Sequence, residues 1–102
     1  MTYTKHAQWD RMDRMTYIQE TVGFGEVIAE HLSRESTTCY RQLTNTGVIL
    51  ITDKAQNVLV TAYIANVGQA VSTYCKATHQ DKIPPELFQI VLRNRPFRAE
   101  QP

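Results

Sequence analysis

The clearest pattern of hydrophobic and polar positions lies in residues 47–65, where two apolar runs flank a short polar turn. The first run, residues 48–51, is aliphatic at every position, which is typical of a central strand covered on both faces. The second run, residues 58–64, follows the turn formers of residues 53–57. Together these runs predict an antiparallel hairpin with a loop of about five residues at the centre of the fold.

Alternation within the second run predicts that its two faces differ. One face would carry Val58, Val60, Ala62 and Ile64. The other face would carry Leu59, Thr61 and Tyr63. A sheet face with Thr and Tyr beside aliphatic residues is either a solvated face or the floor of a site.

The pattern on either side of the hairpin predicts further strands and helices. Residues 37–43 alternate like a strand, and residues 26–32 are a further strand, although a helix is possible there. Four consecutive strands would form an antiparallel meander. The candidate caps Thr4 and Thr16 predict two short helices before it, over about residues 4–14 and 16–22.

Two more helices are predicted after the meander. Asn66 and Gln69 have the spacing of a capping box, and the pair Pro84 and Pro85 begins a final helix that Pro96 stops. The predicted fold class is therefore α+β. It comprises two short N-terminal helices, a four-stranded antiparallel meander and two C-terminal helices that pack on a sheet face.

Length and composition are those of a single globular domain. The chain has 102 residues, 42% of them hydrophobic and 21% charged, as expected for one globular α+β domain over residues 1–102. No apolar run approaches the roughly 20 residues that span a bilayer, and the N-terminus lacks the apolar core of a signal peptide. We therefore expect a cytoplasmic protein without membrane contact. A net charge of +1 argues against an acidic DNA mimic but allows local basic clusters.

The sequence predicts no metal site and no cofactor. His6, His31 and His79 are far apart, and neither a His-x-x-x-His nor a Cys-x-x-Cys motif occurs. Phosphate-binding glycine patterns are also absent. Cys39 and Cys75 are interpreted as buried free thiols. A catalytic pair of Cys39 with His31 stays open at this point.

Two groups of polar side chains could meet if the first helix lies over the sheet. The helix carries His6, Arg11 and Arg14, and the sheet and its turn carry Tyr40, Arg41, Lys54, Thr61 and Tyr63. A metal-free ribonuclease needs a general base, a general acid and cations near the phosphate, and these residue types fill those roles. The alternative is that the helix face is solvated and the two tyrosines are ordinary half-buried sheet aromatics.

Several short motifs resemble a small, uncharacterised family found in bacterial and prophage genomes. They are the segment Thr4 to Ala7, then Arg14, Ile18, the segment Gly25 to Ile28 and the strand Val58 to Tyr63. That family is in turn similar to small ribonuclease toxins with a helix and an antiparallel sheet. The resemblance implies that His6, Arg14, Thr61 and Tyr63 are catalytic residues.

Two functions follow as hypotheses, and they leave open whether the protein is an enzyme. The first is a small phage or mobile-element protein that binds or cleaves RNA without a metal. Its nucleic-acid-binding residues would be Arg11, Arg41, Lys54, Arg93 and Arg95. The second is a non-enzymatic phage or prophage protein that binds and modulates a host or antitoxin-like protein, with a homodimer possible. Strand 26–32 and the C-terminal helices would form that interaction surface.

Overall fold

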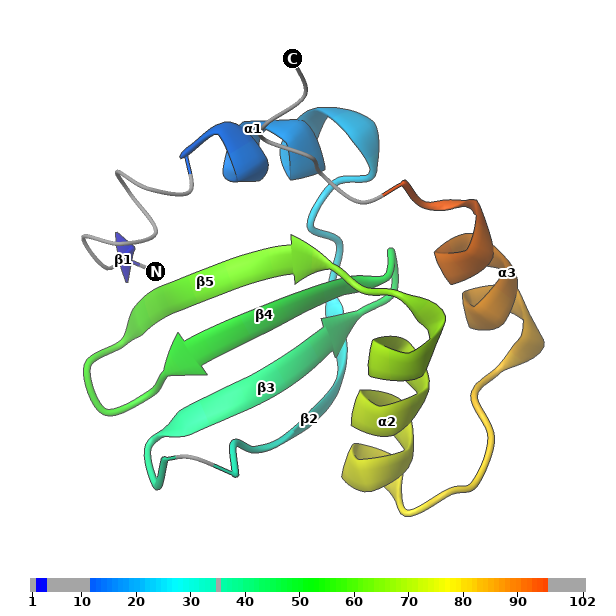
Figure 1. The fold of residues 1–102 in the computed structure, drawn as a ribbon. Coiled ribbons are helices and arrows are strands. Elements are labelled where there is room, and N and C mark those ends of the chain that lie inside the picture. Colours follow the sequence, from blue (N-terminus) through cyan, green and yellow to red (C-terminus); the bar gives the residue numbers. More distant parts are fainter. Residues whose placement is uncertain (1, 4–11, 35, 96–102) are drawn as a thin grey trace.

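The computed structural model of the chain describes residues 2–3, 12–34 and 36–95. These residues form one sheet with helices on both faces (Figure 1). The elements along the chain are β1 (Thr2–Tyr3), α1 (Met12–Thr21), β2 (Val27–Leu32), β3 (Cys39–Thr44), β4 (Val48–Asp53), β5 (Val58–Ile64), α2 (Val67–Thr78) and α3 (Pro85–Arg93).

The sheet confirms the predicted α+β class and the predicted meander. Its strand order is β1-β5-β4-β3-β2, and the strands from β2 to β5 pair antiparallel with their neighbours in sequence. The predicted central hairpin is β4 and β5. Strand β1 was not predicted, because two residues are too few to show a pattern, and it pairs parallel with β5.

Strand β4 contributes to two separate cores, as its uninterrupted apolar run predicts. Val48 and Ile49 are both fully buried, and they point to opposite faces of the sheet. The α1 core lies on one face and contains Met15, Ile18, Val48, Leu59, Ala62 and Ile64. The α2–α3 core lies on the other face and contains Ala29, Leu43, Ile49, Ala65, Ala70, Leu87 and Val91. We refer to these two sides of the sheet as the α1 face and the α2 face.

The prediction of two N-terminal helices was wrong. A single helix, α1, runs through Thr16, the residue predicted to cap a second helix. Met15 and Ile18 are three residues apart, so they share one side of α1 and are both buried against the sheet. Burying this stripe outweighs the local capping preference of Thr16. The part of the first predicted helix over residues 4–11 lies outside the described residues.

The predicted faces of β5 needed one correction. Thr61 pairs with Ile51, but Leu59 pairs with Thr52, so Val60 is the extra residue of a β-bulge. The bulge turns Leu59 to the α1 face, where it joins the α1 core. Thr61 and Tyr63 do share a face, as predicted, and it is the α2 face.

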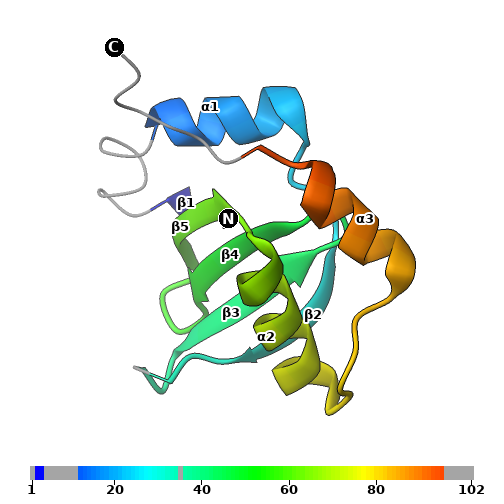
Figure 2. The ribbon, with the colours of Figure 1, turned by 45° about the vertical axis from the view of Figure 1, so that its right-hand side comes forward.

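Helix α2 begins with the predicted capping box. The backbone N–H of Gln69 donates to Asn66 Oδ1 at 2.8 Å, and the backbone N–H of Asn66 donates to Gln69 Oε1 at 2.9 Å. These bonds fix the start of the helix directly after β5. Figure 2 shows α2 in front of the sheet, where it contacts mainly β2 and β3. The helix therefore crosses the α2 face from the end of β5 towards β2.

The three helices of the described ranges contain 10, 12 and 9 residues. None of the three is long and apolar enough to cross a membrane.

Candidate functional site

A cleft of about 670 Å³ lies beside α2 on the α2 face of the sheet. Its floor comes from four neighbouring strands, which contribute His31, Arg41, Ile51 and Tyr63. Its wall comes from α2 and the residue that caps it, with Asn66, Gly68, Gln69, Ser72 and Lys76. Ser33 and Arg34, which follow β2, complete the lining. We call this site the α2 cleft.

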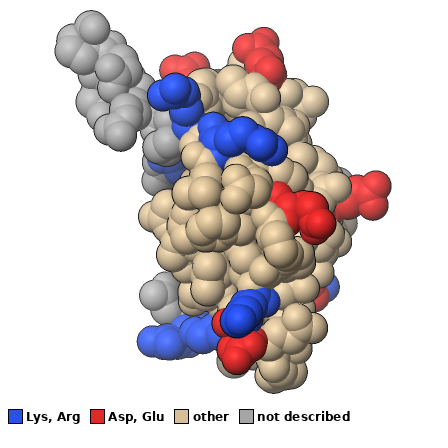
Figure 3. All heavy atoms as spheres, turned by 90° about the vertical axis from the view of Figure 1, so that its right-hand side faces the viewer, with Lys and Arg blue, Asp and Glu red and all other residues tan. Residues whose placement is uncertain are grey.

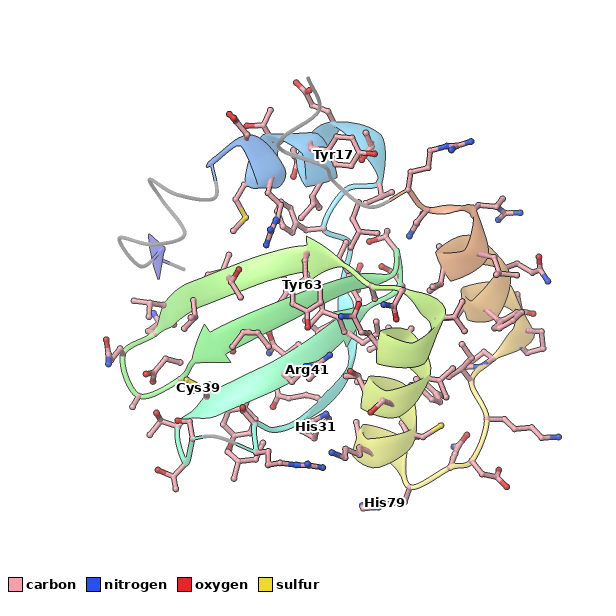
Figure 4. All side chains as sticks on the ribbon, viewed as in Figure 1. Tyr17, His31, Cys39, Arg41, Tyr63 and His79 are labelled. Carbon is pink, nitrogen blue, oxygen red and sulfur yellow. The ribbon has the colours of Figure 1, made fainter. Side chains whose placement is uncertain are left out.

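The floor of the α2 cleft follows the register of the sheet. His31 pairs with Arg41, Arg41 pairs with Ile51, and Ile51 pairs with Thr61. Residues paired in this way point to the same face, so the four side chains form a row across four strands. Figure 4 shows Tyr63, Arg41 and His31 following one another across the sheet beside α2.

Arg41 lies in the middle of this row, and its guanidinium group is held in place. Its Nε donates a hydrogen bond of 2.9 Å to Oγ1 of Thr73, a fully buried residue of α2. Its Cζ lies 5.9 Å from the ring centroid of Tyr63. These contacts use the Nε edge and leave the two terminal nitrogen atoms without a carboxylate partner in the described part of the chain. Such a fork is suited to a carboxylate or a phosphate.

The lining of the α2 cleft is positively charged. Arg34, Arg41 and Lys76 come from three different parts of the chain, and none of the lining residues that the structure describes is acidic. The whole chain has a net charge of only +1, so this is a local concentration of charge. Like charges that converge on a concave surface raise its potential and attract anions.

Two polar atoms beneath the cleft have unused hydrogen-bonding capacity. His31 Nδ1 lies 2.9 Å from the carbonyl oxygen of Leu32, and because a carbonyl only accepts, this bond requires a proton on Nδ1. His31 Nε2 and Thr61 Oγ1 are buried and have no partner among residues 2–3, 12–34 and 36–95. Both residues belong to the row that contains Arg41.

Tyr63 closes the β5 end of the floor. Burial raises the pKa of its hydroxyl group, and the positive charge of Arg41 acts in the opposite direction without cancelling the effect of burial. The hydroxyl therefore keeps its proton at neutral pH and can donate a hydrogen bond.

Of the catalytic residues implied by the family resemblance, the structure describes Arg14, Thr61 and Tyr63, and these three do not belong to one face of the sheet. Arg14 belongs to α1, which packs on the α1 face, whereas Thr61 and Tyr63 point to the α2 face. His6 and Arg11 lie outside the described residues. Helix α1 therefore does not lie over the face that carries Thr61 and Tyr63.

The predicted nucleic-acid-binding residues are also spread over the molecule. Arg41 is in the α2 cleft, but Lys54 lies in the turn between β4 and β5 and forms an ion pair of 2.7 Å with Glu30. Arg93 and Arg95 are exposed at the end of α3. Figure 3 shows the side on which α3 lies, where basic groups are separated by uncharged surface and mixed with acidic groups.

The sequence patterns missed Arg34 and Lys76 and gave His31 a different role. One signal was present in α2, where Gln69, Ser72 and Lys76 follow one another at helical spacing and form a polar stripe. That stripe does not say which strand it will face. Its position beside Arg41 depends on how α2 docks on the sheet.

The histidine and cysteine chemistry left open by the sequence is not assembled here. Cys39 and Cys75 are free and only partly buried. His31 forms its hydrogen bond with the Leu32 carbonyl, and Figure 4 shows Cys39 apart from His31. Over the described ranges, no group of three or more His, Cys, Asp or Glu residues could hold a metal ion.

No protein-family model, curated protein sequence or solved structure matches this chain. Function is therefore inferred from the residues of the α2 cleft.

The Lys54–Glu30 ion pair on the other face leads to a prediction about pH and stability. The hydrogen bonds from the Lys54 ammonium and the Gln42 amide hold the pKa of the Glu30 carboxyl below its usual value of 4.5. The wild type should therefore exceed Glu30→Gln in stability above that pH, and the difference should vanish as the pH falls through the lowered pKa. Because the Lys54 side chain is 51% exposed, we expect a difference of at most about 1 kcal/mol.

Urea unfolding of both proteins at pH 7 and at pH 3 measures this difference. Glu26→Gln is the matched control, since it removes an exposed carboxylate just before the same strand. Its effect should stay within about 0.5 kcal/mol of zero at both pH values. A difference for Glu30→Gln that grows on acidification would contradict the assigned ion pair.

Proposed function

We propose that this protein binds RNA in the α2 cleft. The observation that supports this proposal most strongly is the state of Arg41. Its guanidinium group is oriented by Thr73 and Tyr63, lines an open cleft, and has no carboxylate partner in the described residues. An arginine that is held in this way without a counter-ion is prepared for an anionic ligand.

Phosphate is the anion that fits the rest of the lining. Arg34 and Lys76 add two cations, and Ser72 adds a hydroxyl group that can donate to a phosphate oxygen. Arginine forks bind phosphate with two parallel hydrogen bonds, and lysine binds it as a point charge. The cleft therefore offers several kinds of phosphate contact within one concavity.

Features beside the phosphate-binding groups favour a nucleic acid, and unpaired RNA in particular. Tyr63 places an aromatic ring in the floor, and aromatic rings and arginine planes stack on unpaired bases. The side-chain oxygens of Asn66 and Gln69 cap α2, and their NH₂ groups can donate to base edges or to the 2′-hydroxyl. This proposal keeps the RNA-directed function that the family resemblance implies. Of the residues predicted from the sequence it keeps Arg41 and Tyr63, and it adds Arg34 and Lys76.

Arg41→Gln should weaken the binding of single-stranded RNA by roughly 10- to 100-fold, since a charge-assisted hydrogen bond contributes about 1.5–3 kcal/mol. Fluorescence anisotropy with a short labelled RNA of mixed sequence measures the affinity. For three cations on a single strand, the logarithm of the binding constant should fall with the logarithm of salt concentration with a slope of about −2. Removal of Arg41 should make this slope shallower by about 0.7.

Arg93→Gln is the matched control, because it makes the same chemical change at an exposed position on α3. It should leave both affinity and slope unchanged. Lys76→Met removes a second cation of the cleft and should also weaken RNA binding. Lys76 is exposed and, unlike Arg41, makes no hydrogen bond to the buried Thr73, so its replacement disturbs the packing of α2 less. Equal losses for Arg41→Gln and Arg93→Gln, or no binding by the wild type, would refute the proposal. If the RNA in these samples becomes shorter while a metal chelator is present, the protein also cleaves RNA without a metal ion.

The second candidate function, binding to a partner protein, is favoured by the exposed edge of the sheet. Strand β2 is an outer strand, and no further strand pairs with it in the ranges described. Its apolar residues Val27, Ile28 and Leu32 are 43–48% exposed. An edge strand with exposed apolar side chains can accept a strand from a host protein or from a second copy of this chain.

If this surface binds a host protein, Ile28→Lys and Leu32→Lys should each abolish the recovery of that protein in an affinity pull-down. A charge placed in an apolar interface costs desolvation energy that the partner cannot compensate. The control is Leu92→Lys, which changes an apolar residue that is 53% exposed on α3. Light scattering of the purified protein tests the homodimer directly. Recovery of the same protein with all four chains would exclude the β2 edge as the interface.

A further inference from the structure

We infer that the α2 cleft takes the phosphorylated end of an RNA strand, with the terminal phosphate at its β2 end and the adjoining base at its β5 end. This inference rests on the proposed RNA-binding function and specifies the part of the RNA that is bound. Two observations support it: the three basic side chains in a lining whose described residues include no acidic one, and the distribution of these cations along the cleft.

The charge of the lining matches a terminal phosphate better than a phosphate within a chain. A phosphodiester carries one negative charge, whereas a phosphate monoester carries about 1.5 to 2 at neutral pH and presents three terminal oxygens. Arg34, Arg41 and Lys76 face the same cleft, and the lining residues within 12–34 and 36–95 include no acidic side chain. Each cation interacts more strongly with the higher charge, so the cleft discriminates between the two phosphates.

The positive charge is concentrated towards one end of the cleft. Helix α2 starts beside β5 and crosses to β2, so Gln69 lies near Tyr63 and Lys76 lies near the end of β2. Arg34 follows β2 directly, and Arg41 occupies the middle of the floor. The described lining residues at the β5 end are uncharged and comprise an aromatic ring and side-chain amides.

This division fits the chemistry of a terminal nucleotide. Asn66 and Lys76 are ten positions apart, which corresponds to about 15 Å along a helix. The phosphate would lie against the guanidinium and ammonium groups, and the base would lie over Tyr63 within reach of Gln69. One nucleotide at the end of an RNA strand would then have its base stacked and its phosphate bound in the same cleft. The RNA strand would not need to pass through the cleft.

The test compares four versions of one short single-stranded RNA: 5′-phosphorylated, 3′-phosphorylated, phosphorylated at neither end, and phosphorylated at both ends. Fluorescence anisotropy at one salt concentration gives the four affinities. We expect at least one singly phosphorylated RNA to bind about tenfold or more tightly than the RNA with two hydroxyl ends. The 5′ and 3′ versions show which end is recognised.

Two variants and one control locate the effect. Lys76→Met and Arg34→Gln should reduce the preference for the phosphorylated end to roughly threefold or less while weakening the hydroxyl-ended RNA to a smaller extent. Lys82→Met removes an exposed charge outside the α2 cleft and should leave the preference unchanged. Equal affinity for all four RNAs would overturn this inference and leave RNA binding intact, whereas no binding of any RNA would overturn both.

Discussion

Burial of β4 on both faces is the constraint on which the rest of the fold depends. A central strand that is apolar at successive positions is stable only if each face is covered, because each exposed aliphatic side chain forgoes roughly 1.5–3 kcal/mol of hydrophobic stabilisation. Helix α1 covers Val48, and α2 with α3 covers Ile49. The helices on the two faces of the sheet form separate cores, so the surface beside α1 and the surface beside α2 are built from different side chains.

The α2 cleft is a consequence of how the second layer covers its face. Helices α2 and α3 bury the row that contains Leu43 and Ile49, while the neighbouring row with His31 and Arg41 lines the cleft beside α2. The guanidinium group of Arg41 has no carboxylate partner in the described residues. Thr73 supplies one neutral hydrogen bond and fixes the geometry, but it does not neutralise the charge. On the α1 face, by contrast, Glu30 pairs with a lysine.

Much of the fold could be predicted from the sequence, because it depends on residues that are close together along the chain. The β4–β5 hairpin, the meander and the capping box of Asn66 depend on neighbouring residues, so short patterns identify them. The bulge at Val60 and the continuous α1 through Thr16 were missed, because they depend on packing between elements that are distant in sequence. The candidate site was predicted only in part. Arg41 was included for its charge, but its association with Lys76 depends on where α2 docks.

The functional proposals differ in which surface they use, and this separates them experimentally. RNA binding uses the α2 face, and partner binding uses the outer edge of β2. The catalytic set from the family resemblance combines His6 and Arg14, before and within α1, with Thr61 and Tyr63 on β5. These three surfaces share few side chains. A method that reports contacts residue by residue therefore distinguishes them in one experiment.

The most direct test of the central claim is a ¹⁵N NMR titration of the protein with a short single-stranded RNA that is phosphorylated at both ends. The Nε–Hε signal of Arg41 and the backbone amides of His31, Ser72 and Lys76 should shift together and saturate at one equivalent. The signals of Lys54 and Arg93 should stay in place. Shifts confined to α1, to α3 or to the outer edge of β2, or no shifts at all, would contradict an RNA site in the α2 cleft.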